Sequence, residues 1–170
     1  MRANLAVREP ERITHWESEN LYQKIQDKNS QGEAFILHDG PPFTNGDIHL
    51  GHVLNKTLKD FILRYKSMQG LRTPYVVGWD CHGLPIEHTV SRNLQKKGGE
   101  LTPLQIRKAC AEFSARYINI QKEQFRRLGI LTNWTRDYKT MDPQYEAEVL
   151  NIFSVFVEKG LVYRSKKPVY

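Results

Sequence analysis

Two short apolar runs, each leading into a loop rich in glycine or proline, constrain the fold of this 170-residue chain most strongly. Residues 34–37 lead into a loop at 39–52, and residues 75–77 lead into a loop at 78–87. A long helical pattern separates the two runs, which predicts a strand, a helix and a second strand. The right-handed crossover of such a unit leaves both loops at the carboxyl edge of a parallel sheet. Ligands bind at that edge, so we expect the loops to meet over one pocket.

The helix between the runs is expected to pack an apolar stripe against the body of the protein. If it begins near Ile48, a step of 100° per residue places the apolar side chains on one side. These residues are Leu50, Leu54, Leu58, Phe61 and Tyr65. His49 and His52 fall on the opposite side, at the helix end where free N–H groups and the helix dipole favour a phosphate. Gly51 lies between them and leaves room for a flat ring or a sugar.

Several of these residues have a plainer interpretation that the sequence leaves open. His49 and His52 could be two solvated histidines in a first helical turn. Lys56 and Lys59 share their side of the helix and could extend a positive face or be ordinary exposed lysines.

The loop at 78–87 carries a similar ambiguity. Asp80 could bind a cationic group at the strand edge, or it could cap the following helix by accepting the N–H of His82 or Gly83. Trp79 could support a ligand pocket or belong to the core.

Composition limits the protein class without deciding it. The formal charge of +6 and the pI of about 9.3 would suit a polyanion such as tRNA or ATP, although many soluble domains are mildly basic. Cys81 and Cys110 are too few and too far apart for a cysteine zinc site, and they suggest no secreted disulfides. No apolar run approaches the roughly 20 residues needed to span a bilayer, and no signal-peptide core is evident. The expectation is a cytoplasmic protein without a membrane partner.

The remaining sequence predicts further helices. Residues 13–25 have a short helical pattern, and Thr102-Pro103-Leu104-Gln105 is typical of a capped helix start that leads a long helix to Leu128. Asp142-Pro143 predicts one more helix, which ends at Gly160. A shorter helix follows Glu87 and ends near residues 96–99, and residues 161–170 resemble an interrupted strand. Without a repeat or linker, the chain is expected to form one domain.

Two longer motifs make the sequence recognisable. Gly40-Pro41-Pro42, Asn45-Gly46 and Ile48-His49-Leu50-Gly51-His52, in this order, resemble the HIGH signature of class I aminoacyl-tRNA synthetases. Gly-Trp-Asp-Cys-His-Gly-Leu-Pro-Ile-Glu at 78–87 is closer to the isoleucyl branch than to the valyl or leucyl branches, and residues 134–142 also resemble it. A four-letter match alone would be weak, but two long motifs in the right order and spacing are strong.

The resemblance implies a particular architecture. The fold class would be α/β, with a Rossmann-like parallel sheet and flanking helices that form the first half of a class I synthetase nucleotide-binding fold. Residues 1–33 would be a lead-in that wraps the catalytic domain. Residues 34–170 would be the first half of that domain, ending before the editing insertion. The chain is therefore expected to be incomplete.

The resemblance also implies an activity and its site. The family uses ATP to convert L-isoleucine to isoleucyl-adenylate and then transfers the amino acid to tRNA(Ile). His49 and His52 would be the catalytic residues and would hold ATP phosphates, with Gly40, Asn45 and Gly51 completing the ATP site. Gly40, Pro41 and Asp80 would bind the amino acid, with Asp80 holding its α-ammonium group.

Cofactors and partners follow from the same resemblance. Mg²⁺ would accompany ATP, although the sequence offers no carboxylate cluster for it and no zinc or other metal site. The full-length enzyme would be a monomer. The Lys-Met-Ser-Lys-Ser loop that supplies lysines to the pyrophosphate in the family does not occur in this sequence, so weak ATP binding at most is expected.

Two other functions remain open at this point. A nucleotidyltransferase of the same superfamily could adenylylate a small acid without tRNA, although the motif at 78–87 disfavours it. A non-enzymatic alternative is an inactive truncated remnant or a basic RNA-binding module, whose affinity for tRNA would fall steeply with salt and ignore ATP.

Overall fold

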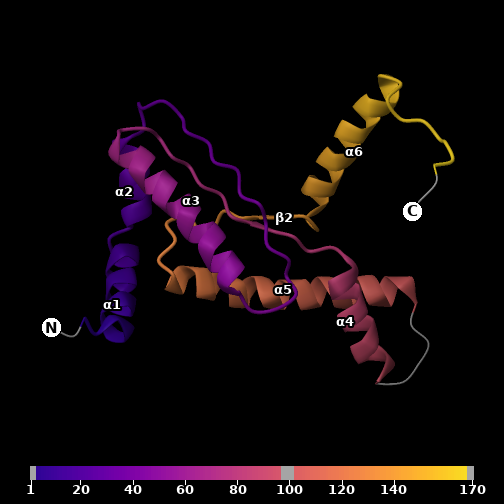
Figure 1. Cartoon of the computed structure of the whole chain (residues 1–170), viewed down its shortest axis with the longest axis horizontal. Coiled ribbons are helices and arrows are strands. Elements are labelled where there is room, and N and C mark those ends of the chain that lie inside the picture. Colours follow the sequence, from indigo (N-terminus) through magenta and orange to yellow (C-terminus); the bar gives the residue numbers. More distant parts are fainter. Residues whose placement is uncertain (1–2, 97–101, 168–170) are drawn as a thin grey trace.

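The computed structural model describes residues 3–96 and 102–167, which form helices around a short parallel sheet (Figure 1). The elements are α1 (Leu5–Ser18), α2 (Leu21–Lys28), α3 (Leu50–Met68), β1 (Gly78–Trp79), α4 (Leu84–Gln95), α5 (Pro103–Arg127), β2 (Tyr138–Lys139) and α6 (Pro143–Glu158). In Figure 1, α5 runs horizontally across the lower half of the view with α4 below it, and α6 projects away from the other helices. None of the α6 residues is buried.

The predicted βαβ unit is present only in part. The segments before and after α3 run parallel, and they are joined at both ends by isolated bridges, Ala34 to Arg72 and Phe43 to Asp80. Between the bridges the two segments form no continuous ladder with each other, and the Gly78 N–H donates to the Asp39 carboxylate at 3.0 Å. The regular sheet is smaller than predicted, and a complete Rossmann-like sheet is not confirmed.

The two regular strands lie next to the second predicted run. β1 pairs in parallel with β2, with Gly78 opposite Tyr138 and Trp79 opposite Lys139. The sequence placed a strand at residues 75–77, and the paired residues begin directly after it. The partner strand β2 was not predicted, because two paired residues leave no detectable alternation in a sequence.

The predicted orientation of α3 is wrong. Its apolar stripe is exposed, with Leu50 at 84% and Leu54 at 63% relative accessibility, whereas Lys56 is at 2%. The side that faces the body is held by charged pairs around Lys56 and Asp60. Periodicity correctly identified which residues share a side, but it does not report which side contacts the protein.

The core lies between the segment at 75–81 and α5. Trp79 is fully buried and stacks on Phe125 of α5 with ring centroids 5.9 Å apart. Its indole N–H donates to Asp137 at 3.0 Å. Trp79 therefore belongs to the core and does not line a ligand pocket. Other buried members of this cluster are Leu63, Tyr75, Val77, Cys81, Ile118 and Ile130.

The helix boundaries predicted from capping residues are largely confirmed. Thr102 and Gln105 form the expected capping box at the start of α5, and Gly129 adopts a φ of +77° just beyond its end. α6 begins with Pro143 as predicted. Residues 161–167 form no strand in the structure, and the end predicted for α4 falls partly at 97–99, outside the described residues.

Gly78 is expected to be intolerant of a side chain. A Cβ atom there would lie 2.0 Å from the Tyr138 ring, whose hydroxyl donates to the Asp39 carbonyl at 2.7 Å. We expect Gly78→Ala to lower the free energy of unfolding by about 1–3 kcal/mol, measured by urea denaturation. Gly46→Ala is the matched control, because its Cβ would meet no atom within 4 Å. Equal losses in both variants would contradict this packing argument.

Candidate active site

The two histidines of the predicted site form the N-terminal cap of α3. His49 is the N-cap residue, and its Nδ1 accepts the Gly51 N–H at 3.1 Å. His52 Nδ1 accepts the His49 N–H at 3.2 Å, and the two rings stack with centroids 3.9 Å apart. This is a capping box in which imidazoles replace the usual hydroxyl and carboxylate. His49 is exposed and His52 is half-buried, so neither ring is enclosed in the core.

The capping bonds determine which ring nitrogen can bind a ligand. In a neutral imidazole, one nitrogen accepts and the other carries the proton. Because Nδ1 of both rings accepts a backbone N–H, the proton of each neutral ring lies on Nε2. The helix end therefore presents two imidazole N–H donors beside its own free backbone N–H groups, a combination suited to an anion.

Burial, together with the charges of His49 and Lys56, holds the pKa of His52 below its ordinary value of 6.5. The unfolded chain therefore binds this proton more readily, so the stabilisation from neutral His52 is complete above about pH 6.5 and decreases as the pH falls below it. We expect the free energy of unfolding to drop more between pH 7.5 and 5.5 in the wild type than in His52→Asn. An identical pH dependence in both proteins would contradict this role.

A side chain at Gly51 would displace the His49 ring from its capping position. A Cβ atom at Gly51 would lie 2.9 Å from Cε1 and 3.1 Å from Nδ1 of His49. The His49 ring folds back over the Gly51 backbone, which explains the absent side chain more directly than the approach of a ligand.

The predicted loop residues lie at the surface before α3. Gly40 and Asn45 are exposed, and Pro41 is half-buried. A Cβ atom at Gly40 would meet only Lys59 Nζ, at 3.9 Å, so the loop leaves space above its backbone. These residues can therefore be reached from solvent.

Asp80 lies directly against this loop. Its N–H donates to the Pro42 carbonyl at 2.9 Å, and its carbonyl accepts the Thr44 N–H at 3.0 Å. The two predicted loops thus meet, as the sequence predicted.

The carboxylate of Asp80 is available for a cation. Gly83, and not Asp80, is the N-cap residue of α4, but the bond to the His82 N–H that the capping alternative predicted is present and leaves Asp80 free for a second role. One carboxylate oxygen accepts the His82 N–H at 3.4 Å, a long hydrogen bond. Among residues 3–96 and 102–167, Asp80 forms no ion pair, and it is only half-buried. No described Lys, Arg or His nitrogen therefore lies within 4.0 Å of its carboxylate.

Phe125 of α5 connects the two motifs. The His52 ring meets it edge-on with centroids 6.4 Å apart, and the ring of Trp79, the residue before Asp80, stacks on it. The histidine cap and the aspartate loop are thus both packed against one rigid aromatic pair.

A buried charge cluster beneath this site was missed by sequence reasoning. Asp39 is 1% exposed, and its carboxylate accepts hydrogen bonds from Lys56, from Lys59 at 2.9 Å and from the Tyr75 hydroxyl at 2.8 Å. The Gly78 N–H adds a fourth donor. Asp39 therefore ties the first loop, α3 and β1 together.

The charges of this cluster depend on one another. Burial favours the neutral acid, but the ammonium groups of Lys56 and Lys59 and the Gly78 N–H outweigh it and hold the pKa of Asp39 below its usual value. Burial lowers the pKa of Lys56, and the charge of Asp39 opposes that shift. The interpretation of Lys56 as an exposed lysine is wrong. The sequence contains one signal for this cluster: Lys56 and Lys59 lie on the same side of the helix as His52, one turn and two turns after it, where they can share a partner.

The structure adds two negative findings about the described residues. In the ranges 3–96 and 102–167, no three His, Cys, Asp or Glu side chains gather where they could hold a metal ion. These residues therefore do not fit a dedicated Mg²⁺ site. No helix in the same ranges is both long and apolar enough to cross a membrane.

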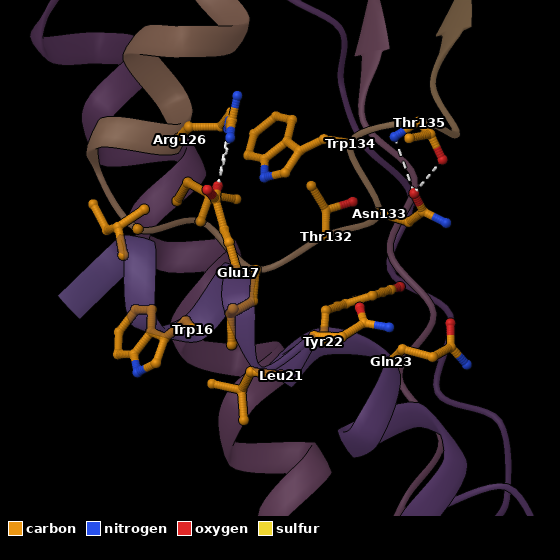
Figure 2. Close-up of a pocket in the computed structure, with 15 residues that line it drawn as sticks. Trp16, Glu17, Leu21, Tyr22, Gln23, Arg126, Thr132, Asn133, Trp134 and Thr135 are labelled. Carbon is orange, nitrogen blue, oxygen red and sulfur yellow. Dashed lines mark hydrogen bonds and ion pairs between the residues drawn. The ribbon is translucent and has the colours of Figure 1, made fainter. Parts of the chain in front are cut away.

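A separate cavity of about 450 Å³ lies between the helices α1 and α2 and the segment after α5. Figure 2 shows Trp16, Tyr22 and Trp134 at this cavity, with the ion pair of Arg126 and Glu17 at 2.8 Å near its rim. None of the predicted site residues lines it. The candidate site is instead an open surface at the loop edges.

Comparison with protein families decides the broader assignment. The model for class I tRNA synthetases specific for I, L, M and V matches residues 11–170. The chain belongs to this family. The resemblance found in the sequence is thereby confirmed.

Individual relatives narrow the branch. The chain is 50% identical to an isoleucine–tRNA ligase from Caldicellulosiruptor bescii and 51% identical to one from Kosmotoga olearia, over all 170 residues. It spans only 18% of the length of each. The LeuRS in a crystal structure of an Agrobacterium radiobacter K84 agnB2 LeuRS-tRNA-LeuAMS ternary complex has a TM-score of 0.72 and 26% identity. That likeness covers 98% of this chain and 19% of the LeuRS chain. The fold is therefore that of a class I synthetase.

Proposed function

We propose that this chain supplies the ATP-phosphate and amino-acid-ammonium contacts of an isoleucine–tRNA ligase active site. The observation that carries the proposal is the pairing of Asp80 with residues 42–44, which brings an unpaired carboxylate to the loop that leads into the histidine cap. His49 and His52 hold ATP phosphate oxygens through Nε2, with Gly40, Asn45 and Gly51 beside the nucleotide. Asp80 binds the α-ammonium group of L-isoleucine, next to Gly40 and Pro41.

The chemistry requires positioning more than covalent catalysis. A carboxylate oxygen of isoleucine attacks the α-phosphorus of ATP, a new P–O bond forms, and the bond to the leaving pyrophosphate breaks. Donors held in place before the reaction stabilise the charge that develops on phosphate oxygens. The Nδ1 bonds fix both imidazoles, so no side-chain reorganisation is needed when the phosphate arrives. Mg²⁺ enters this proposal only as the ion carried by ATP.

The proposal also covers tRNA transfer, the domain division, the oligomeric state and the location. Transfer of the amino acid to tRNA(Ile) is an activity of the longer enzyme, since this chain spans 18–19% of its relatives. The division into a lead-in at 1–33 and half of a catalytic domain at 34–170 stays a prediction. So do the monomeric state and the cytoplasmic location.

Calorimetric titration with ATP tests the proposal. We expect weak binding by the wild type that falls by about tenfold or more in His49→Ala and in His52→Ala, because each variant loses a hydrogen bond to a charged group. His15→Ala is the matched control, since His15 is an exposed histidine on α1. ATP binding that is indifferent to both site histidines would contradict the proposal.

The alternative function is a basic RNA-binding module, which the family match does not favour. Such a module would bind tRNA with an affinity that falls steeply with salt and would not respond to ATP or to the histidine variants.

A further inference from the structure

Two glutamines of α5 hold the loop that precedes the histidine cap. Gln121 Nε2 donates to the carbonyl of Phe43 at 2.9 Å and to that of Gly46 at 2.7 Å. Three residues later on the same side of the helix, Gln124 Oε1 accepts the Ile48 N–H at 2.9 Å. Its Nε2 donates to the Asp47 carboxylate at 2.7 Å. Residues 43–48 are therefore fastened at both ends to a helix outside the family motifs.

The loop has little else to fix its shape. Within the described residues, the only bond from a 44–47 N–H to the rest of the backbone is that of Thr44 to the Asp80 carbonyl. Asn45 and Asp47 are exposed, and a Cβ atom on Gly46 would touch nothing within 4 Å. The path of the chain between Thr44 and Ile48 thus depends on side chains of α5.

The orientation of the Gln121 amide is determined by its surroundings. Two carbonyl oxygens lie within hydrogen-bond distance of one amide atom, so that atom is the NH₂ group. The side chain is fully buried, and its Oε1 has no hydrogen-bond partner among the described residues. An unsatisfied buried acceptor offsets much of what the two donated bonds contribute to stability. The main effect of Gln121 is therefore on the conformation of the loop.

We propose that Gln121, assisted by Gln124, is a positioning residue that sets the conformation of loop 43–48 and so places Asn45 and the histidine cap for nucleotide binding. The second half of this statement rests on the proposed function; the first half does not. Neither glutamine contacts the reacting atoms in this account. Both act through the backbone of the loop.

Amide hydrogen exchange without nucleotide tests the positioning of the loop. Gln121→Met keeps the length of the side chain and removes both donors. We expect the Thr44 and Ile48 amides to exchange about tenfold faster or more, with little change in the urea midpoint, because local opening is measured separately from global unfolding. Gln124→Met, at a half-buried site, should accelerate Ile48 exchange in the same way. Unchanged exchange of these amides in folded variants would overturn the proposal.

Ile118→Val is the matched control for a purely structural effect. Ile118 is buried on α5 at 3% exposure and has no hydrogen bond to the loop. Its loss of a methylene should lower global stability while leaving loop exchange and ATP affinity unchanged. Equal acceleration of Thr44 exchange in Ile118→Val and Gln121→Met would show that Gln121 acts only as packing, and would overturn the inference.

ATP titration of the same variants separates this inference from the proposed function. We expect Gln121→Met to weaken ATP binding by about tenfold, since a mobile loop reduces the fraction of molecules competent to bind. If the wild type shows no histidine-dependent ATP binding but Gln121→Met accelerates loop exchange, the proposed function fails and the positioning of the loop stands. If the wild type binds ATP and Gln121→Met binds it equally well, the inference about nucleotide binding fails.

Discussion

Asp39→Asn is expected to destabilise the chain by about 3–5 kcal/mol, because it leaves the ammonium group of Lys56 buried without a countercharge. Lys56 is 2% exposed, and Asp39 is the carboxylate that it contacts. Urea denaturation followed by circular dichroism measures the loss. The amide oxygen can still accept hydrogen bonds from Lys59 and Tyr75, whereas the NH₂ group faces Lys56 and the Gly78 N–H. The variant therefore keeps the shape of the side chain but removes the charge and two accepted hydrogen bonds.

Two further variants make this prediction specific. Asp39→Asn combined with Lys56→Met removes both members of the buried pair, and we expect it to be more stable than Asp39→Asn alone. Glu19→Gln makes the same chemical change in an exposed pair with Lys24, at 2.6 Å, and should have little effect. A loss in Asp39→Asn no larger than that in Glu19→Gln would show that the cluster does not stabilise the fold.

Asp80→Asn is expected to weaken L-isoleucine binding by about 10- to 100-fold, the size of a lost hydrogen bond between charged groups. The α-ammonium group needs a carboxylate, and Asp80 has no competing ion pair among the described residues. Calorimetric titration with isoleucine at saturating ATP measures the change.

The control for this prediction is Asp27→Asn on α2, an exposed carboxylate outside the candidate site. It should bind isoleucine as the wild type does. If Asp80→Asn also retained wild-type affinity, another group would have to hold the ammonium, and the assignment of Asp80 would be wrong.

Local signals in the sequence predicted the features that local chemistry determines. Thr102 and Gln105 mark the start of α5, because their side chains satisfy backbone groups three residues apart. The meeting of the two loops also followed from the sequence, because a parallel crossover leaves few alternatives. The Phe43–Asp80 bridge is the result.

Features that depend on distant partners could not be predicted in this way. Lys56 is buried because its ammonium group pairs with the carboxylate of Asp39, which lies 17 positions earlier in the chain. Nothing in the local pattern of α3 indicates that pairing. The hydrogen bonds from Gln121 and Gln124 to loop 43–48 join residues that are 75 to 78 positions apart in the chain. Both devices combine polar residue types that, read singly, are typical of a solvated helix surface.

The reversed orientation of α3 has a related cause. An apolar stripe identifies a surface suited to burial, but whether it is buried depends on what the rest of a protein places against it. The relatives contain four-fifths or more of their length outside the region matched by this chain. The hydrophobic periodicity of α3 and α6 therefore did not predict which of their side chains are buried within these 170 residues.

Binding of a non-hydrolysable isoleucyl-adenylate analogue tests most directly whether the histidine cap and Asp80 serve one ligand. The measurement is its affinity for the wild type, His52→Ala and Asp80→Asn, beside the affinities for ATP and for isoleucine alone. We predict that ATP binding responds to His52, isoleucine binding responds to Asp80, and analogue binding is weakened by either substitution. Analogue affinity that is unaffected by one of the two would mean that these groups belong to separate surfaces, and would contradict a shared site.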